Sequence, residues 1–543
     1  MKRRVLALLL TMVMIMSVIT ACSKADKTAD NTGNTSNGQQ SDVTDDNEDD
    51  NEEAEELSIL KLYKEKGSDG EYKYTETYSG YIAYMEYEVL HLNPEDAEKY
   101  PALNETLENL ADGVIANVKS VFEDTREAAI NDFDPDNTDY SMVYTIKENY
   151  HVRRADESVL AIAQQYEAYS GGAHSYYATL PDNYDTKTGE LIEFTDVVTD
   201  LDKAYERIAE EIKKKYADSI DMFISDLSFK EQKNNEVPQL FMIDYDGITV
   251  LFNPYDIAPY SIGQVTVKLS FEDNKDILDE KYFANVPTSY IVELSPFDEY
   301  TMDIDDDGEL DTIKILPIFP TLYEAAISVQ VIVNGQEKDI KDDSLYTFII
   351  NSFLVKAPTG KVYAYLECIE FNDYATINLV EITKNGASDR VEIDGGISDP
   401  MYAVDQSEGY KWIQGVITDP NDMQLAIRRE VFGTCYISKS YKVGEDGSPV
   451  SDDKYYTFDS RLDYTAKKEM SFKIVDEDGN EIEDYDLKVG DHVYAYRTDA
   501  ATFVDAKLSD GRIVRFNITK NEWPYLIDGV EIQEIFENVI FAG

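Results

Sequence analysis

The sequence predicts a multi-domain protein with an α+β domain at residues 58–285, an all-β region at 286–465 and a small β-barrel at 466–543. Three observations lead to this fold class. The chain has 543 residues, which is enough for several domains of about 150 residues each. Segments with helical periodicity occur only before residue 286. Beyond it, β-branched residues and tyrosines alternate between turn dipeptides, which is typical of strands.

The composition limits the classes of partner. The chain contains 49 basic and 108 acidic residues, for a formal net charge of −59. Such an excess of negative charge excludes nucleic acid as a partner, because phosphates would be repelled. It favours cationic proteins or divalent metal ions. Apolar residues make up 43% of the chain, so folded cores are expected despite the charge.

The N-terminus has the order of parts found in a bacterial lipoprotein signal peptide. Lys2, Arg3 and Arg4 precede an apolar run over residues 5–18, and Ile19-Thr20-Ala21-Cys22 follows it. We expect cleavage before Cys22 and lipidation of that cysteine, which would anchor the chain at the outer face of the cytoplasmic membrane of a Gram-positive-type bacterium. The alternative is an ordinary signal peptide at residues 1–21. The run is too short for a spanning helix of about 20 residues.

Residues 22–57 follow as an acidic, polar stretch with almost no apolar side chains. Such a stretch cannot bury enough surface to offset its ordering entropy, and its like charges repel one another. We expect a disordered tether between the lipid anchor and the folded body. A metal-binding acidic tail is the alternative.

Elements of the α+β domain follow from periodicity. Alternation predicts strands at Tyr81–Tyr87, Met142–Ile146, Val159–Tyr169 and Gln264–Leu269. Apolar residues at steps of three and four predict helices at Thr106–Phe122 and Leu201–Tyr216, the second with Asp200 as its N-cap. Asp246-Gly247 between two apolar runs predicts a β-hairpin.

The rest of the chain reads as strands. Turn signals such as Asn334-Gly335, Thr359-Gly360 and Asn385-Gly386 divide residues 286–465 into strands of a sandwich or a propeller-like fold. In residues 466–543, strands at Thr502–Leu508 and Arg512–Ile518 flank Asp510-Gly511. This last pattern is similar to SH3-like barrels, whose core Trp523-Pro524-Tyr525 and Phe536 would cap; a peptide-binding groove is the alternative. Cys368 and Cys435 could pair outside the cytoplasm or remain buried thiols.

One acidic loop has the composition of a calcium site. Asp303, Asp305, Asp307 and Asp311 offer carboxylates around Gly308, and the backbone carbonyl of Glu309 would supply one more ligand. Calcium takes six to eight oxygen ligands. Lys314 stands where an EF-hand has its bidentate glutamate. The loop instead resembles the calcium loops of integrin-type propeller repeats, which lead into a strand. We expect structural calcium here; the alternative is an acidic turn. Asp476-Glu477-Asp478-Gly479-Asn480 predicts only a hairpin turn.

No enzyme signature occurs in the chain. It contains neither G-x-S-x-G nor H-E-x-x-H nor a glycine-rich phosphate loop. His91, His151 and His492 lack zinc-site spacing. With 108 acidic residues, a pair of carboxylates carries no information about catalysis. We therefore expect a protein that is not an enzyme and has no catalytic residues.

A cluster of aromatic and glycine residues is the best candidate for ligand contact. A predicted strand ends at Tyr169, followed by Ser170, Gly171, Gly172 and His174, and the glycine pair permits unusual backbone angles. A second loop, Pro254–Gly263, carries Tyr255, Pro259 and Tyr260. Taken from the residues alone, these are recognition loops or a packed corner in equal measure.

Three motifs add a family resemblance. Tyr100-Pro101-Ala102-Leu103-Asn104, the Ser170–His174 turn and the Pro254–Gly263 loop look like the paired uncharacterised extracellular domains of lysozyme-sensing anti-sigma factors, which also accompany some peptidoglycan deacetylases. The resemblance covers about residues 58–285. It implies an α+β ectodomain whose loops bind lysozyme or a cell-wall component, with Ser170 and Pro259-Tyr260 as contacts. The anti-sigma part, its spanning helix and the deacetylase domain have no counterpart in this sequence.

Two functions are consistent with these observations. The first is a membrane-anchored extracellular lipoprotein that binds a basic protein such as lysozyme, or a peptidoglycan component, as sensor, decoy or inhibitor. The alternative is a calcium-stabilised cell-wall or carbohydrate-binding adhesin. An enzyme acting on peptidoglycan is the weakest reading.

Overall fold

The computed structural model describes residues 57–541, apart from 77, 136–141, 235, 296–298, 320–325, 341–346, 371–373, 398–409 and 460–461. The predicted signal peptide, Cys22 and nearly all of the predicted tether lie outside these residues. Within them, the helices are all too short or too polar to cross a membrane.

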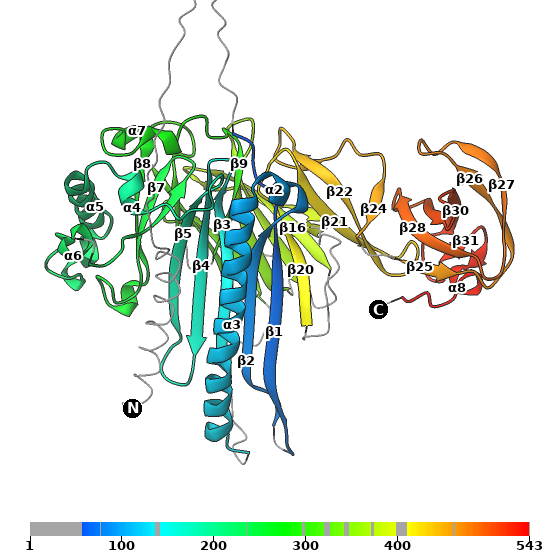
Figure 1. The fold of residues 1–543 in the computed structure, drawn as a ribbon, viewed down its shortest axis with the longest axis horizontal. Coiled ribbons are helices and arrows are strands. Elements are labelled where there is room, and N and C mark those ends of the chain that lie inside the picture. The colour runs from blue at the N-terminus through cyan, green and yellow to red at the C-terminus, as the bar shows by residue number, and fades with distance from the viewer. Residues whose placement is uncertain are drawn as a thin grey trace, which may run out of the picture.

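The N-terminal part is a mixed sheet with the long helix α3 packed on one face (Figure 1). Its strand order is β20-β1-β2-β3-β4-β5. β2 and β3 are parallel, so α2 and α3 form the crossover that parallel neighbours need. The bounds are β1 (Leu62–Tyr74), β2 (Ser79–Leu92), α2 (Pro94–Lys99), α3 (Pro101–Asp132), β3 (Tyr144–Ala155), β4 (Val159–Tyr169), β5 (Tyr176–Asp185) and β20 (Tyr410–Val416).

Helix α3 is longer than the predicted 106–122, but its apolar stripe is the predicted one. Leu107, Ala111, Val114, Val118 and Phe122 are all buried against the sheet. The sheet strands alternate accordingly, since successive side chains point to opposite faces. In β3, Tyr144, Ile146, Tyr150 and Val152 pack in the core under α3, and the odd-numbered residues before the bulge at Arg153 face the other way.

Strand β20 comes from beyond the boundary that the sequence predicts at residue 285. It pairs antiparallel with β1 from Leu62 opposite Val416 to Ser68 opposite Tyr410. The N-terminal sheet therefore has an edge strand supplied by the β-rich half of the chain.

Residues 194–284 form a smaller α+β layer beside β5. Helix α5 begins after Asp200, whose side chain accepts a hydrogen bond from the Lys203 N–H, as the sequence predicts. The Tyr245-Asp246 turn makes the predicted hairpin. The elements are α4 (Phe194–Val197), α5 (Leu201–Lys215), η1 (Ala217–Met222), α6 (Lys230–Lys233), β6 (Leu240–Asp244), β7 (Gly247–Phe252), η2 (Tyr260–Ile262), β8 (Val265–Ser270), α7 (Phe271–Asn274) and η3 (Glu280–Tyr282).

A buried ionic cluster joins this layer to the N-terminal sheet. Asp244 lies between the Arg153 guanidinium at 3.2 Å and the Lys268 ammonium at 2.7 Å, and all three side chains are at most 1% exposed. Burial by itself would raise the pKa of Asp244, but the two cations hold it below its ordinary value. Breaking one partner of such a buried set costs several kcal/mol, about 3–5 in typical cases, so the two layers are fixed together.

The β-rich half begins with two sheets that face each other over one core. The core includes Val292, Ile313, Val331 and Leu354. One sheet has the order β10-β11-β12-β13 and the other β17-β16-β15-β14-β9, with β18 on β16. The bounds are β9 (Tyr290–Leu294), β10 (Tyr300–Met302), β11 (Asp311–Ile318), β12 (Ser328–Val333), β13 (Gln336–Ile340), β14 (Thr347–Lys356), β15 (Val362–Glu370), β16 (Ala375–Thr383), β17 (Gly386–Ala387) and β18 (Val391–Asp394).

The second of these sheets is buried on both faces. Its other side packs on β21 and β22 through a separate core that includes Phe353, Tyr365 and Leu425. The sheets therefore stack in layers, and the described strands do not form the blades of a propeller. The predicted turns at Asn334-Gly335, Thr359-Gly360 and Asn385-Gly386 each join paired strands.

The C-terminal strands are continuous with β21 and β22. The order is β19-β21-β22-β24-β28-β29-β30-β26-β27, with β23, β25, β31 and β32 beside it. The bounds are β19 (Gly396–Ile397), β21 (Met423–Arg429), β22 (Cys435–Val443), β23 (Pro449–Val450), β24 (Tyr456–Phe458), β25 (Asp463–Thr465), β26 (Met470–Val475), β27 (Glu481–Leu487), β28 (His492–Thr498), β29 (Phe503–Leu508), β30 (Ile513–Lys520), β31 (Leu526–Ile527), β32 (Val530–Glu531) and α8 (Ile532–Ile535).

The SH3-like barrel predicted for residues 466–543 is not closed among the described strands. The second edge of β28 pairs with β24 and β25, and β24 pairs in turn with β22, so β28 does not close onto β27. The predicted strands at 502–508 and 512–518 are present as β29 and β30. Phe536 is buried in their core as predicted, but Trp523 is 65% exposed and does not cap it.

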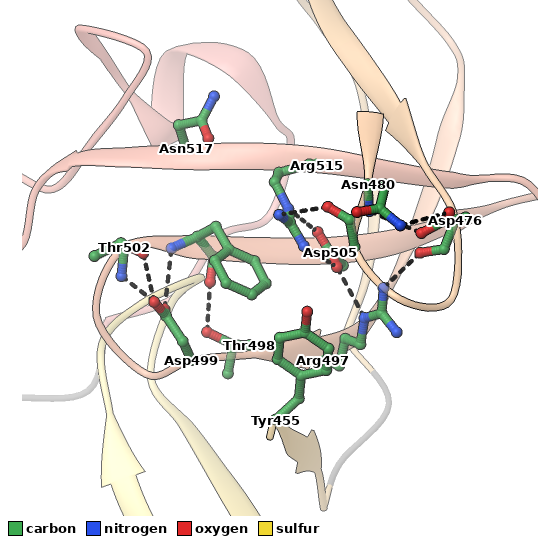
Figure 2. A network of polar contacts seen from close by, with 12 residues as sticks. Tyr455, Asp476, Asn480, Arg497, Thr498, Asp499, Thr502, Asp505, Arg515 and Asn517 are labelled. Atoms are coloured by element: carbon green, nitrogen blue, oxygen red, sulfur yellow. Dashed lines mark hydrogen bonds and ion pairs between the residues drawn. The ribbon is translucent and has the colours of Figure 1, made fainter. Parts of the chain in front are cut away.

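Two arginines hold the β26–β27 hairpin turn to the C-terminal strands (Figure 2). Asp505 is fully buried and accepts hydrogen bonds from Arg497 Nε at 2.8 Å and Arg515 Nε at 2.7 Å. Their other nitrogens donate to turn carbonyls, those of Asp476 and Gly479 among them. The Asp476–Asn480 motif is thus a braced hairpin turn, as its sequence predicts.

Candidate functional site

The structure brings the two predicted contact loops together. The His174 ring stacks on the Tyr260 ring with centroids 3.8 Å apart, and the Tyr260 hydroxyl donates to the Ser175 carbonyl at 2.9 Å. Tyr255 and Tyr177 each lie 5.8 Å from Tyr260 between ring centroids. We call His174, Tyr177, Tyr255 and Tyr260 the aromatic contact cluster.

The β4–β5 turn presents His174 through its glycine pair. Gly171 and Gly172 have φ angles of +81° and +136°, a region that favours glycine. A side chain at Gly171 would also lie 2.8 Å from the Tyr144 hydroxyl. The Tyr169 hydroxyl donates to the Gly172 carbonyl at 3.1 Å and fixes the turn. Ser170 and His174 are exposed, so both are available for contact.

The second loop is held against β5 by an asparagine. The Asn253 side chain accepts from the Thr179 N–H and donates to the Thr179 carbonyl, as a neighbouring strand would. Pro259 precedes the short helix η2, which carries Tyr260. Tyr255 has a φ of +76° and is 60% exposed. The sequence motif places this loop, but it does not reveal that the buried amide of Asn253 holds the loop to β5.

Next to this cluster lies a large groove of about 2570 Å³, which we call the central groove. Its floor is the face of the N-terminal sheet opposite helix α3. The opposite wall comes from β11, β14 and β15 of the β-rich half. Tyr169 and His174 lie at its edge, together with Tyr177 and Gln264. Two of the predicted contact residues, Tyr169 and His174, therefore line a groove that sequence reasoning did not find.

Charged residues on the groove floor are paired with one another. The Lys64 ammonium lies 2.5 Å from Glu293 and 3.1 Å from Glu88, and Lys66 lies 2.6 Å from Glu88. Burial by itself would raise the pKa of Glu293, but Lys64 and His151 lower it to about 2. Burial would lower the pKa of Lys64, and the same carboxylates raise it above its ordinary value. The network thus stays ionised and internally neutralised.

The predicted calcium loop gathers three of its four predicted carboxylates. Oxygens of Asp303, Asp305 and Asp311 lie within 4.8 Å of one another. The Asp307 carboxylate instead pairs with the Lys384 ammonium at 2.7 Å, and that ammonium also lies 2.6 Å from Asp305. Asp303 accepts hydrogen bonds from the loop's own N–H groups at Asp307 and Gly308. Glu309 is exposed and is not part of this group.

The cysteines and the remaining histidines have structural surroundings. Cys368 and Cys435 are both buried and free, so they do not pair. Burial raises the pKa of each thiol to about 12, which makes them poor nucleophiles. His91 contacts Glu108 at 2.9 Å and stacks on Tyr63.

Comparisons with known proteins place one segment in a family. Residues 194–272 match the model of a family described as "Protein of unknown function (DUF3298)". A solved structure of that family from Bacteroides fragilis is 17% identical, covers 41% of this chain and 96% of its own, and has a TM-score of 0.32. Another, from Pseudomonas aeruginosa, is 16% identical, covers 40% and 95%, and has a TM-score of 0.28.

No curated protein sequence matches the chain. The segment that matches the family runs from α4 into α7 and includes the loop that carries Tyr255, Pro259 and Tyr260. The β4–β5 turn with Ser170 and His174 lies before it. Residues 194–272 are therefore a DUF3298 domain.

Proposed function

We propose that this chain is a lipid-anchored extracellular binding protein whose aromatic contact cluster takes a basic, wall-active protein such as lysozyme. The observation that supports it is that two loops whose contacting residues, Ser175 and Tyr260, are 85 positions apart in the sequence meet in one aromatic surface. Tyr255 is 60% exposed there, and His174 stacks on Tyr260. Tyrosines in such a position are frequent binding hot spots. The net charge of −59 would speed encounter with a cationic partner.

The test is lysozyme binding to the whole mature chain at moderate salt. The whole chain is needed because β20 completes the N-terminal sheet. Tyr260→Ala should weaken binding by about tenfold or more, as loss of a central aromatic contact does. The control is Trp523→Ala, an exposed aromatic in the C-terminal part at the other end of the molecule (Figure 1). Absence of lysozyme binding by the intact chain would contradict the proposal.

The second candidate is a calcium-stabilised surface adhesin, favoured by the gathering of Asp303, Asp305 and Asp311. Calcium should raise the melting temperature, and Asp305→Asn should abolish the increase. Asp389→Asn is the control, because Asp389 is exposed and pairs only with Lys338 among the ion pairs of the described chain. An identical melting temperature with calcium and with a chelator would exclude structural calcium at this loop.

We also propose that the chain does not cleave peptidoglycan. Purified cell wall incubated with the protein should release no soluble product. If the purified protein did release muropeptides from the cell wall, an enzyme acting on peptidoglycan would be favoured instead.

A further inference from the structure

The central groove contains buried amide groups that have no hydrogen-bond partner. Gln165 on β4 is 7% exposed, and its Nε2 is unpartnered. Across β5, neither the Nε2 nor the Oε1 of Gln264 has a partner. Both residues line the groove. A buried amide without a partner is unfavourable, so a ligand that supplies the missing hydrogen bonds is selected over one that does not.

The lysines on the groove floor are already paired with carboxylates, which favours a neutral ligand there. Lys147 lies 2.8 Å from Glu86, Lys66 2.6 Å from Glu88 and Lys64 2.5 Å from Glu293. Each floor cation thus already has a carboxylate partner. A charged ligand would have to break these pairs, whereas a neutral polar one would leave them intact.

The size and the floor of the groove favour a saccharide chain over a small molecule or a peptide. Its volume of about 2570 Å³ exceeds the roughly 300–1,000 Å³ of a small-molecule pocket. The floor is the face of a sheet whose N–H and C=O groups are already used between strands, so a peptide cannot bind there by strand addition. Tyr84, Tyr169 and Tyr177 add flat apolar surfaces with a polar end, which suit sugar rings.

We propose that the central groove binds a neutral oligosaccharide, with Gln165 and Gln264 hydrogen-bonding its hydroxyl or acetamido groups. Gln165 lies opposite Asn149 of β3 in the strand register, so two amides stand side by side on the floor. This site goes beyond the proposed protein-binding surface. It also deepens the second candidate function, because it gives carbohydrate recognition a defined place outside the calcium loop.

The test is calorimetric titration of the whole mature chain with chitotetraose and with cellotetraose, two uncharged tetrasaccharides. At least one should bind, and Gln165→Leu should weaken that binding by about tenfold or more, since a site built to hydrogen-bond its substrate loses most when one partner is removed. The same variant should keep or raise the melting temperature, because it replaces an unpartnered buried amide by an apolar group. A purely structural glutamine would not give this combination.

The matched control is Gln239→Leu. Gln239 also has a buried unpartnered amide oxygen, but it precedes β6 and does not line the groove. Its substitution should leave saccharide affinity unchanged. Failure of both tetrasaccharides to bind would overturn the inference, as would wild-type affinity in Gln165→Leu or binding of an uncharged Ser/Gly hexapeptide in their place. Lysozyme binding is measured separately on the same variants, so each proposal can fail while the other stands.

Discussion

Buried carboxylates on the two faces of the N-terminal sheet have pKa values shifted in opposite directions. On the groove face, Glu88 and Glu293 lie against Lys64, and all three side chains are largely buried. On the helix face, Glu148 is 2% exposed and accepts a hydrogen bond from the Gln164 Nε2, but its other oxygen has no partner. Glu88 belongs to β2 and Glu148 to β3 of this sheet, whereas Glu293 comes from β9 of the facing sheet, so the two faces differ in the neighbours they offer.

This difference shows that burial alone raises the pKa of a carboxylate, and that a cationic partner can reverse the direction of the shift. Burial raises the pKa of Glu148 to about 7, although the hydrogen bond from Gln164 opposes the change. Burial acts on Glu293 in the same direction, yet Lys64 and His151 bring its pKa down to about 2. The groove face can therefore remain polar and ionised, as a surface for a polar ligand must be.

The largest effect on the free energy of unfolding is expected from removing a paired carboxylate on the groove face. Glu293→Ala leaves Lys64 with Glu88 alone and removes the carboxylate that accepts from the Val152 N–H at 3.2 Å. We expect the free energy of unfolding to fall by about 3–5 kcal/mol at pH 7, measured by urea denaturation. Adding Lys64→Met should recover part of the loss, because no uncompensated charge then remains. A loss below about 1 kcal/mol would show that the network is hydrated rather than buried.

The next largest effect on stability is expected from Glu148, the carboxylate without a cationic partner on the helix face, and this effect depends on pH. The pKa of Glu148 is about 7 in the folded chain against an ordinary value of 4.5. Its protonated form therefore favours folding below pH 4.5, and this stability is lost as pH rises toward 7. Glu148→Gln should be about 3 kcal/mol more stable than wild type at pH 8 and equal to it near pH 4.

The control for that experiment is Glu167→Gln, a half-buried carboxylate on the groove face of β4. It removes one charge from the same sheet without emptying a buried site. If both variants gave the same difference at every pH, net charge rather than burial of Glu148 would be responsible. The pairing of Glu293 has the reverse sign: its stability is present above pH 4.5 and is lost as pH falls toward 2.

Much of the fold could be predicted from local pattern. The stripe on α3, the Asp200 cap and the turns at Asp246-Gly247 and Asp510-Gly511 are properties of neighbouring residues. Local sequence pattern could not predict which distant segments pair as strands. Strand β20 joins β1 across more than half of the chain, and β24 and β25 occupy the edge of β28 that a closed barrel would need.

The same limit applies to the site. Glycines and tyrosines marked both contact loops, and the stacking of His174 on Tyr260 shows that those loops meet. The central groove was not predicted, because its floor alternates polar residues with core residues as any half-exposed strand does. Gln165 becomes notable only when the structure shows it buried without a partner. Spacing alone also does not reveal that Lys384 pairs with both Asp305 and Asp307 of the predicted calcium loop.

The smallest effect on the free energy of unfolding is expected from an exposed ion pair. It tests whether exposure or pairing contributes more to stability on the groove face. Lys147 and Glu86 form a short ion pair, with 2.8 Å between Nζ and Oε1, but their side chains are 37% and 31% exposed. Water therefore competes with the pair, and Lys147→Met should cost less than about 1 kcal/mol of unfolding free energy. The loss should shrink further in high salt, which screens exposed charges, whereas the loss in Glu293→Ala should change little. A salt-independent loss above about 2 kcal/mol in Lys147→Met would mean that the groove is closed to solvent and that its whole floor behaves as the buried network does.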